Sequence, residues 1–460
     1  MNMHLPLIEN ENSTFMTQAS GFSQMSMVEI EIGRLLPTVS AFDEKTGHHH
    51  QRALCLVRLH TQPLGWVELQ LDEGEVSPHE YAQHIWRTLS VKINEHLRQD
   101  GLSPVTGLDM KGLPTPTRPR CLEERDEFFT HAPFVSIIVS TRDRPERIQS
   151  CLRSLVSLRY PQYEVIVVDN APSRNVTADF IQQTYHNVPW VHYIREDRPG
   201  ASWARNCGIM AARGEILAFT DDDVVVDPYW LVELVRAFSL ADNVACVTGL
   251  ALPLELETPA QFWFEEHDGL NERFTLRIFD LAENHPRTPL YPYTVGQFGT
   301  GSSMAFTAAF LQSIGGFDPA LGPGSSAPAG EELALFFEVV TRGYKLVYAP
   351  ASLLYHLHRR DYTSLRRQIY SYGVGLTAYL TKILLDNPRI LFDLVTKVPY
   401  GLYFSLSSRS PLNKKKSTHY PKELTRVELK GMLYGPFAYL RSRWVVGRAR
   451  KASSSRDGLP

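Results

Sequence analysis

The 460-residue chain has few cysteines, no long apolar run and almost no net charge. Its five cysteines are widely spaced and form no Cys-x-x-Cys pair, so the sequence predicts neither a disulfide framework nor a zinc site. This pattern indicates a reducing, cytosolic setting. A net charge of −3 argues against a nucleic-acid-binding protein, because such proteins are usually basic overall. We therefore expect no nucleic acid among its partners.

Signals for export and for membrane crossing are also missing from the sequence. The N-terminal residues lack the basic and apolar regions of a signal peptide. The nearest approach to a transmembrane segment, Ile390–Leu406, is interrupted by Asp393, Lys397 and Pro399. It also falls short of the roughly 20 apolar residues that a membrane-spanning helix needs. These features predict a cytoplasmic protein.

The size and composition of the chain predict two or three structural units, since 43% of the residues are hydrophobic. We divide the sequence into five segments by composition and pattern. These are a disordered N-terminus (residues 1–25), a small α+β accessory domain (27–105), a proline-rich linker (106–132), an α/β core domain (133–360) and a helical, basic C-terminal region (361–460).

The α/β core shows apolar runs alternating with helical patterns. The runs that predict strands are Val135–Val139, Glu164–Asp169, Val191–Ile194 and Ile216–Thr220. Such alternation is typical of βαβ units on a mostly parallel, Rossmann-like sheet. The first strand–helix junction, Ser140–Glu146, has none of the glycines of a dinucleotide-binding Gly-x-Gly-x-x-Gly loop. This argues against a dehydrogenase.

Three consecutive aspartates, Asp221–Asp223, directly follow the fourth predicted strand. Ligands of open α/β sheets bind at the carboxyl ends of the strands, and carboxylate oxygens are preferred ligands of Mg²⁺ and Mn²⁺. The alternative is an acidic turn that caps a helix beginning at Pro228, because aspartate is favoured near helix N-termini. The flanking sequence favours the metal site.

Two further positions suit nucleotide binding. Asp169 ends the second predicted strand and would accept hydrogen bonds from a base or ribose, although Asp-Asn-Ala-Pro is also an ordinary turn sequence. Arg205 lies on the first turns of a helix whose Gly-Ala-Ser start presents free backbone N–H groups, which suits a diphosphate. The alternative for Arg205 is a surface position on an amphipathic helix.

Eight motifs in this order resemble those of a family 2 glycosyltransferase with the A-type, nucleotide-sugar-binding fold. They are Ser140-Thr-Arg-Asp-Arg-Pro145, Val167-Val-Asp-Asn170, Pro199-Gly-Ala-x-x-Ala-Arg-Asn206, Phe219-Thr-Asp-Asp-Asp223, Gly299-Thr-Gly-Ser-Ser-Met304, Gly315-Gly-Phe-Asp318, Gly330-Glu-Glu332 and Leu354-Tyr-His356. The resemblance covers residues 134–361, about half of the chain. Its specificity comes from the order and spacing of the motifs together.

The resemblance implies roles for individual residues. Those implied to bind the nucleotide sugar are Thr141, Arg142, Asp143, Asp169, Arg205, Asp221 and Asp222. Those implied as ligands of Mn²⁺ or Mg²⁺ are Asp221 and Asp223, the two ends of the Asp-x-Asp motif, and His356. Those implied at the acceptor side are Gly301, Phe317, Asp318 and Glu331. Glu332 falls where the family places its catalytic base.

The implied activity is an inverting, metal-assisted transfer of a hexose from a nucleotide-diphosphate sugar to an acceptor hydroxyl. A UDP-sugar is the favoured donor, the acceptor is a glycan, a lipid or a small molecule, and cell-envelope or polysaccharide synthesis is the expected setting. The sequence departs from the family at Glu331-Glu332, which replaces Glu-Asp, at Ala334, where an acidic residue is common, and at Ser302-Ser303. These departures keep a non-catalytic sugar-nucleotide-binding or assembly protein open as the alternative. A sugar nucleotidyltransferase is disfavoured because Ser140–Glu146 lacks glycine.

The C-terminal region combines basic and aromatic residues. Between residues 409 and 451 there are twelve Lys or Arg against two Glu. The residues that predict peripheral contact with the inner membrane face are Lys414, Lys415, Lys416, Arg441, Arg443, Arg448, Arg450, Tyr434, Phe437, Tyr439 and Trp444. The alternative is a soluble tail whose charges are solvated.

Overall fold

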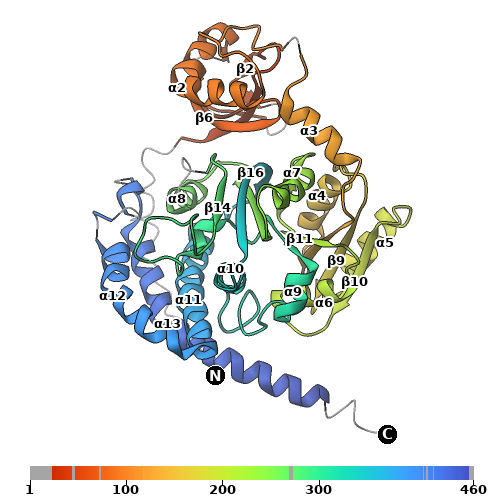
Figure 1. Cartoon of the computed structure of the whole chain (residues 1–460), viewed down its shortest axis with the longest axis vertical. Helices are drawn as coiled ribbons and strands as arrows, with labels where there is room; N and C mark the ends of the chain where they lie inside the picture. Colours follow the sequence, from red (N-terminus) through yellow and green to blue (C-terminus); the bar gives the residue numbers. More distant parts are fainter. Residues whose placement is uncertain are drawn as a thin grey trace.

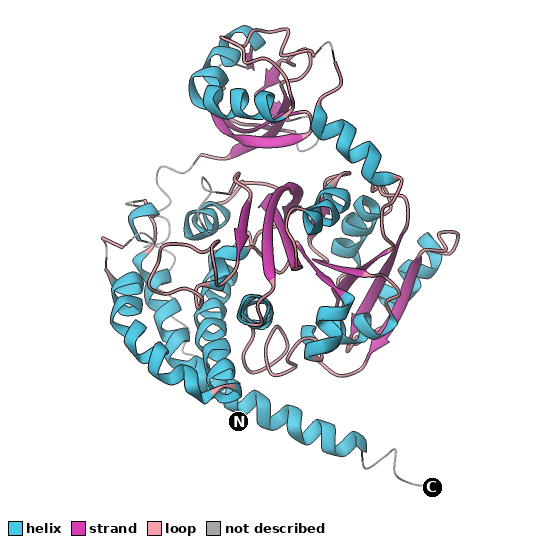
Figure 2. Cartoon of the chain, viewed as in Figure 1, coloured by secondary structure: helices cyan, strands magenta, loops and turns pink. Residues whose placement is uncertain are grey.

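The computed structural model describes residues 23–43, 47–71, 74–115, 117–268, 273–407, 409–410, 413–417 and 419–454. It contains a small N-terminal α+β unit, a central sheet flanked by helices, and a group of C-terminal helices (Figure 1). The strands gather in the first two of these parts (Figure 2). The predicted disordered segment lies outside the described residues except for its last three, of which Met25 begins strand β1.

The N-terminal unit is a three-stranded sheet covered by one long helix. Strand β5 (Arg52–Leu59) lies between β1 (Met25–Glu31), which is parallel to it, and β6 (Gln62–Gln70), which is antiparallel. Helix α2 (Pro78–Gln99) buries its apolar face against this sheet in a separate hydrophobic core. Four short strands complete the unit, β2 (Val39–Ser40), β3 (Phe42–Asp43), β4 (His48–His49) and β7 (Glu75–Val76).

Part of the predicted linker forms a helix, α3 (Arg120–Phe129), which lies between the N-terminal unit and the central sheet (Figure 1). It is held by Arg125, whose guanidinium lies 3.8 Å from the ring centroid of Tyr229 and 3.4 Å from the carboxylate of Glu233. The prolines that suggested an irregular linker end at Pro119, which occupies the N-cap, so the residues after it are free to be helical.

The central sheet has nine strands in the order β10-β9-β8-β11-β15-β13-β16-β12, with β14 paired to β16. Their bounds are β8 (Val135–Thr141), β9 (Tyr163–Asn170), β10 (Val191–Glu196), β11 (Ile216–Asp221), β12 (Val224–Val226), β13 (Val244–Pro253), β14 (Arg277–Phe279), β15 (Met304–Thr307) and β16 (Lys345–His356). Strands β12, β14 and β15 run opposite to the other six. The α/β class and the mostly parallel sheet predicted from the sequence are therefore confirmed.

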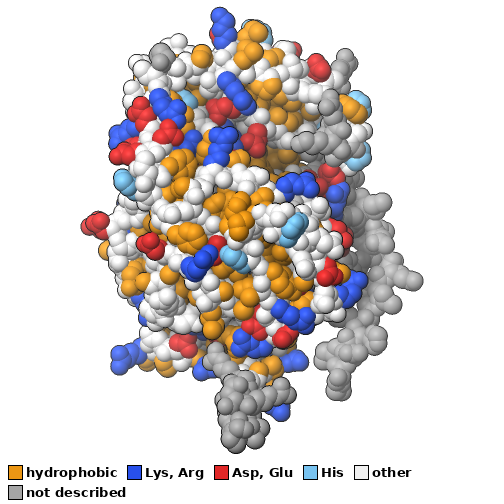
Figure 3. All heavy atoms as spheres, turned by 90° about the vertical axis from the view of Figure 1, so that its right-hand side faces the viewer, with side chains coloured by type: hydrophobic (Ala, Val, Ile, Leu, Met, Phe, Trp, Pro, Cys, Tyr) orange, Lys and Arg blue, Asp and Glu red, His pale blue; other side chains and the backbone are white. Residues whose placement is uncertain are grey.

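Helices cover both faces of this sheet, which explains why its strands are continuously apolar. In β8, Ile137 and Val139 join the core beneath α4 and α7, whereas Ile138 joins the core beneath α6, α9 and α10. The helices are α4 (Pro145–Leu155), α5 (Val176–Tyr185), α6 (Ala201–Ala211), α7 (Trp230–Arg236), α8 (Pro259–Asp268), α9 (Ala308–Ile314) and α10 (Glu331–Thr341). At the edge formed by β10 and α5, positive and negative side chains are interspersed on the surface (Figure 3).

The C-terminal region consists of helices α11 (Tyr362–Asp386), α12 (Leu391–Leu406) and α13 (Lys422–Ser454). Helices α11 and α13 cross at close range because glycines lie at the contact. A Cβ atom added to Gly373, for example, would lie only 2.0 Å from the backbone oxygen of Glu428. Within the described ranges, none of the helices is both long and apolar enough to span a membrane.

Candidate active site

Strands β8, β9 and β11 end side by side, and the predicted site residues follow from that arrangement. The parallel register pairs Ser140 with Asp221 and Thr141 with Asp169. The carboxyl ends of neighbouring parallel strands meet at one edge of a sheet. Residues that are far apart in the sequence are thereby brought to one place.

The three aspartates point in different directions. Asp221 is the last residue of β11 and its side chain is one-third exposed. Asp222 is buried and accepts a hydrogen bond of 2.7 Å from the hydroxyl of Thr141. Asp223 is also buried, and its Oδ1 atom lies 3.2 Å from Nε2 of His356. Asp221 and Asp223 are thus the pair that a ligand can share.

The structure contradicts the alternative that these aspartates cap a helix. Strand β12 follows the triplet directly, and α7 begins only at Trp230. The aspartate that hydrogen-bonds the backbone before α7 is Asp227, whose Oδ1 accepts the N–H of Tyr229 at 2.8 Å.

His356 reaches the triplet because β12 pairs antiparallel with the end of β16, opposite Val224. Ligand atoms of Asp221, Asp223 and His356 all lie within 4.8 Å of one another. Two carboxylates and one imidazole form a donor set that fits Mn²⁺, and the carboxylates alone suit Mg²⁺. The predicted metal ligands therefore form one compact group.

A second histidine, which the sequence analysis did not single out, fixes the orientation of His356. Nδ1 of His356 lies 3.0 Å from Nδ1 of His358, and Nε2 of His358 lies 2.5 Å from the buried carboxylate of Glu265. Outer partners of this kind set the ring orientation of a metal-binding histidine. The available signal was the second histidine of Tyr355-His-Leu-His358, which lies just after the end of β16.

The aspartates and His356 shift one another's pKa values. Burial disfavours ionisation of Asp223, but hydrogen bonding to His356 and the nearby positive charges outweigh it, so the pKa of Asp223 is lowered. Burial disfavours the charged form of His356, yet Asp223 outweighs it and the pKa of His356 is raised. Burial, together with the charge of Asp223, raises the pKa of Asp222 to about 6. A divalent cation would take the place of the proton shared by Asp223 and His356.

Three arginines surround the aspartates, and sequence reasoning had not assigned them a role. Nη1 of Arg147 donates to Asp223 at 2.8 Å, and Nη1 of Arg359 lies 3.7 Å from the same oxygen. Arg144 approaches Asp222 at 3.6 Å. Their guanidinium groups line the cavity described below and suit the oxygens of a diphosphate. The signal was the basic residues directly after β8 and β16.

Arg205 is buried and links two acidic residues, so the alternative of a surface arginine is wrong. Its Nη1 donates to Glu331 at 2.7 Å, and its Nη2 lies 3.3 Å from Asp221. The guanidinium therefore sits beside the aspartate that faces the predicted diphosphate. It also holds the first residue of α10.

Glu331 and Glu332 differ in surroundings although they are adjacent. Both line the cavity, but Glu331 is buried against Arg205, whereas Glu332 is partly exposed and lies opposite Gly301. A Cβ atom on Gly301 would lie 3.5 Å from Cγ of Glu332, so glycine leaves room there. Burial, reinforced by the charge of Glu331, raises the pKa of Glu332 to about 8. A carboxylate with a raised pKa is suited to accept a proton near neutral pH.

The residues predicted to bind the nucleoside, at the ends of β8 and β9, differ in whether they reach the cavity. Arg142 lines the cavity. Asp143, at a positive φ of 53°, accepts hydrogen bonds from the backbone and hydroxyl of Ser173, which tie the first loop to the second. Asp169 is fully buried, with Oδ2 accepting from the hydroxyl of Tyr193 at 3.1 Å, so its contact with a nucleoside stays a prediction. Its neighbour Asn170 does line the cavity.

Two residues predicted at the acceptor side do not reach the cavity. Phe317 packs in the core, 5.3 Å between ring centroids from Phe219. Asp318 accepts hydrogen bonds from the backbone of Ala320 and from the hydroxyl of Tyr439 on α13. The Gly-Phe-Asp turn therefore supports the site through packing, because its aromatic ring is too apolar to remain outside the core.

One cavity of about 2100 Å³ contains the metal-binding group, the three arginines and Glu332. It continues between the C-terminal helices, where apolar side chains line it together with polar ones such as Arg367, Lys397 and Glu428. The apolar residues on that side are Leu376, Leu380, Leu394, Val398, Leu402, Phe404, Leu406, Met432 and Leu433. The cavity thus joins the charged site to a region of mixed apolar and polar lining.

Residues 136–299 match the sequence model of the family described as "Glycosyl transferase family 2". Among curated proteins, the pre-mycofactocin glycosyltransferase of Mycobacterium tuberculosis is 24% identical over 225 residues, which cover 49% of this chain and 43% of that protein. Glycosyltransferase AglE of Haloferax volcanii is 38% identical over 112 residues, which cover 23% of this chain and 36% of that protein. The chain thus spans less than half the length of these two relatives.

Among solved structures, the mannosyltransferase PcManGT of Pyrobaculum calidifontis, in complex with GDP-Man and Mn²⁺, aligns with a TM-score of 0.41 and 17% identity. The alignment covers 70% of this chain and 77% of that one. The motifs, the order of the strands and the family match agree on one assignment. Residues 136–299 match glycosyl transferase family 2, and the mostly parallel sheet to which they contribute is consistent with the A-type fold that the motifs predict.

Proposed function

We propose that this protein transfers a sugar from a nucleoside-diphosphate sugar to an acceptor hydroxyl, with inversion at the anomeric carbon and with the help of a divalent metal ion. The observation that carries the proposal is the meeting of the Asp221, Asp223 and His356 group with Glu332 in one cavity. A donor diphosphate and an acceptor both need to reach such a site. Uridine is the base we expect in the donor.

The residues of the cavity have separate tasks in the proposed reaction. The acceptor hydroxyl gives its proton to Glu332, and its oxygen bonds to the anomeric carbon from the side opposite the diphosphate. The bond from that carbon to the diphosphate oxygen breaks, and its electron pair leaves with the nucleoside diphosphate. A single displacement of this kind inverts the anomeric centre. Arg144, Arg147 and Arg359 hold the diphosphate oxygens.

A divalent cation held by Asp221, Asp223 and His356 would neutralise the negative charge that develops on the leaving diphosphate. Arg205 acts as a positioning residue, because it fixes Asp221 at one end and the start of α10 at the other. The distance between the metal ligands and the proposed base, Glu332, therefore depends on the buried ion pair of Arg205 and Glu331.

The proposal is tested by incubating the full chain with sugar-labelled nucleotide donors and Mn²⁺, and following the release of labelled sugar to water or to added acceptors. We expect release from at least one donor, and its loss in excess EDTA. Donor binding without any release would support the non-catalytic sugar-binding alternative. Full turnover in EDTA would contradict metal assistance.

We further propose that the C-terminal helices lie on an anionic membrane surface. Helix α12 has no buried residue, and exposed apolar side chains continue onto α13. The most exposed of these are Phe392, Val395, Leu402, Leu406, Leu433, Phe437 and Trp444. Exposed basic side chains accompany them at Lys414, Arg441, Arg443 and Arg448. Apolar and basic groups together suit the interface of an anionic bilayer.

The structure corrects one residue of the predicted membrane face. Tyr439 is 2% exposed, and its hydroxyl donates to Asp318, so it belongs to the contact between α13 and the core domain. The side chains of Lys415 and Arg450 lie outside the described residues.

In flotation with vesicles containing anionic lipid, we expect the wild-type protein to bind at low salt and to bind less at high salt, since screening weakens charge attraction. Changing Phe392 and Phe437 to glutamate together should abolish binding. Met210→Glu is the matched control, because Met210 is an 87% exposed apolar residue on α6, in the core domain. Equal binding of the double variant and the control would contradict the proposal.

A further inference from the structure

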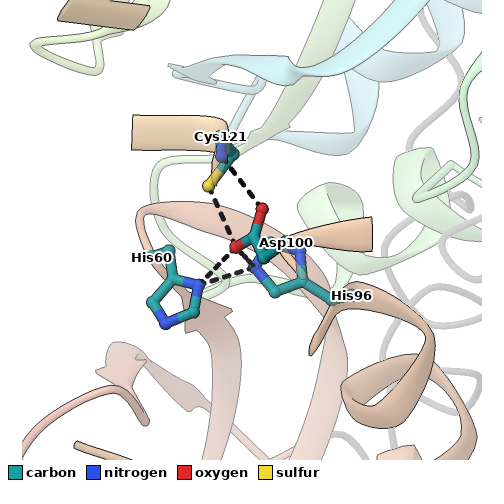
Figure 4. A group of neighbouring side chains, drawn as sticks. All are labelled: His60, His96, Asp100 and Cys121. Carbon is teal, nitrogen blue, oxygen red and sulfur yellow. Dashed lines mark hydrogen bonds and ion pairs between the residues drawn. The ribbon is translucent and has the colours of Figure 1, made fainter. Parts of the chain in front are cut away.

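Four side chains that bind metals well converge in the N-terminal unit, away from the cavity. They come from three elements, with His60 in the turn between β5 and β6, His96 and Asp100 at the end of α2, and Cys121 in the first turn of α3 (Figure 4). Ligand atoms of all four lie within 4.8 Å of one another. His60, His96 and Asp100 are buried, and Cys121 is partly exposed.

The distances within this cluster are somewhat shorter than those between the ligands of a tetrahedral zinc site. Zn–N and Zn–O bonds of about 2.0–2.1 Å and a Zn–S bond of about 2.3 Å place ligand atoms roughly 3.3–3.6 Å apart. Here Nδ1 of His60 lies 3.0 Å from Nε2 of His96. Oδ2 of Asp100 lies 2.6 Å from the first nitrogen, 3.1 Å from the second and 3.2 Å from Sγ of Cys121. Small outward shifts would make room for an ion.

Hydrogen bonding alone explains this cluster poorly. Two imidazole nitrogens that lie 3.0 Å apart and one thiol all crowd the single oxygen Oδ2 of Asp100, at distances of 2.6, 3.1 and 3.2 Å. The other oxygen of Asp100 already accepts the backbone N–H of Cys121 at 3.0 Å. A cation at the centre would instead use one lone pair from each side chain. With neutral imidazoles, one carboxylate and one thiolate, the charge of a divalent ion is fully balanced, as burial requires.

We propose that His60, His96, Asp100 and Cys121 form a structural zinc site. Four protein ligands leave no open position, as in structural rather than catalytic zinc sites. Binding releases the thiol proton of Cys121 to solvent, so the affinity rises with pH. This site shares no residue with the Asp221, Asp223 and His356 group.

The backbone of the turn is held in a form that presents His60 to the cluster. His60 and Thr61 have positive φ angles of 54° and 71°, although Thr is β-branched and rarely adopts this region. The backbone N–H groups of His60 and Thr61 donate to the carboxylate of Glu31. The guanidinium of Arg58 donates to the backbone carbonyl oxygen of Thr61. Strained turns persist where the surrounding structure fixes them.

The proposed ion would join the N-terminal unit to the core domain. Cys121 lies in the first turn of α3, and the same helix carries Arg125, which donates to the hydroxyl of Thr61 at 2.9 Å and pairs with Glu233 of α7. Zinc would therefore fix the turn, the end of α2 and the start of α3 as one corner. Its loss should lower the melting temperature.

The test is the zinc content of the full-length protein, purified without a histidine tag and dialysed against a weak chelator that strips Mn²⁺ or Mg²⁺. We expect one zinc per wild-type chain by plasma mass spectrometry, and none in Cys121→Ala or His96→Ala. Cobalt exchanged into the wild type should give the visible bands of a tetrahedral site and a thiolate charge-transfer band. The thiolate charge-transfer band should be absent in Cys121→Ala.

Two variants serve as controls. Cys207→Ala removes another partly buried cysteine and should keep the zinc, and Asp223→Asn should also keep it because it alters only the other metal group. A wild-type protein without zinc that gives no cobalt spectrum would overturn the proposal and leave a hydrogen-bonded cluster. Zinc retained in Cys121→Ala but lost in Asp223→Asn would overturn it as well.

Discussion

Replacing Glu332 with glutamine should lower turnover by about 10²–10⁴-fold while the donor dissociation constant stays the same, because general-base assistance is worth that much. Glutamine keeps the shape of the side chain but cannot take the acceptor proton. The measurements are steady-state transfer rates and calorimetric titration of the donor with Mn²⁺. Transfer at the wild-type rate would place the base elsewhere.

Two variants of the same helix serve as controls for Glu332→Gln. Glu338→Gln removes a carboxylate that pairs with Arg342 at 2.7 Å, away from the cavity lining, and should leave turnover unchanged. Glu331→Gln should lose less than Glu332→Gln, since glutamine still accepts a hydrogen bond from Arg205. An equal loss in Glu331→Gln and Glu332→Gln would mean that the ion pair, and not the base, limits turnover.

The raised pKa of Glu332 gives this prediction a pH dependence. The base acts when ionised, so kcat/KM should rise with pH and level off above about 8, and the residual activity of Glu332→Gln should lack this rise. Because the carboxyl holds its proton more tightly in the folded state, ionising it lowers stability as pH rises from the unfolded pKa to about 8. Glu332→Gln should therefore melt at the same or a higher temperature than wild type at pH 8.5. A lower melting temperature would show that lost activity reflects misfolding.

Replacing Asp223 with asparagine should reduce turnover by roughly 10³-fold. A metal ion stabilises the developing charge by several kcal/mol, and each 1.4 kcal/mol is about a factor of ten in rate. Asparagine removes one of the two carboxylate charges of the metal-binding group and replaces the charged acceptor of Arg147 with a neutral amide. The measurement is turnover at increasing Mn²⁺, where wild type should saturate and the variant should not.

Asp222→Asn is the matched control for Asp223→Asn. Its carboxylate accepts from Thr141 and is not part of the metal-binding group, so the loss should be much smaller and Mn²⁺ should still saturate the activity. If both variants lose the same activity, the triplet acts through its total charge and not through two specific ligands.

The sequence predicted the core domain well because the relevant signals are local. Apolar runs at 135–139 and 164–169 became β8 and β9, with ends extended by one or two residues. The run at 216–220 became β11, with one more residue at its end. Helix α3 was missed because its position depends on Arg125 meeting Tyr229 and Glu233, contacts across more than 100 residues.

The candidate site was predicted in part, for a similar reason. Asp221, Asp223 and His356 were chosen from their motifs, and sheet pairing brings them together. Arg147 and Arg359 were not, although basic residues follow both β8 and β16, because the sequence does not show which of these arginines reach the aspartates. Phe317 was misplaced, since the motif that contains it supports the site without lining it.

The histidine, aspartate and cysteine cluster of the N-terminal unit was not visible in the sequence. Metal sites are recognised from pairs of ligands at short spacing, and only His96 and Asp100 lie that close. The expectation of no zinc site rested on the absence of Cys-x-x-Cys. The fold, and not the spacing, brings His60 and Cys121 to them.

The central claim is that the Asp221, Asp223 and His356 group binds a metal ion that in turn holds a nucleoside diphosphate. The most direct test is a thermal-shift panel of nucleoside diphosphates and their sugars, with and without Mn²⁺, on wild type and Asp223→Asn. A ligand at 100 times its dissociation constant stabilises the folded state by about 2.7 kcal/mol. We predict that at least one nucleotide raises the wild-type melting temperature only with Mn²⁺, and that Asp223→Asn shows no such rise. No rise with any nucleotide in the presence of Mn²⁺, or an equal rise in Asp223→Asn, would contradict the account.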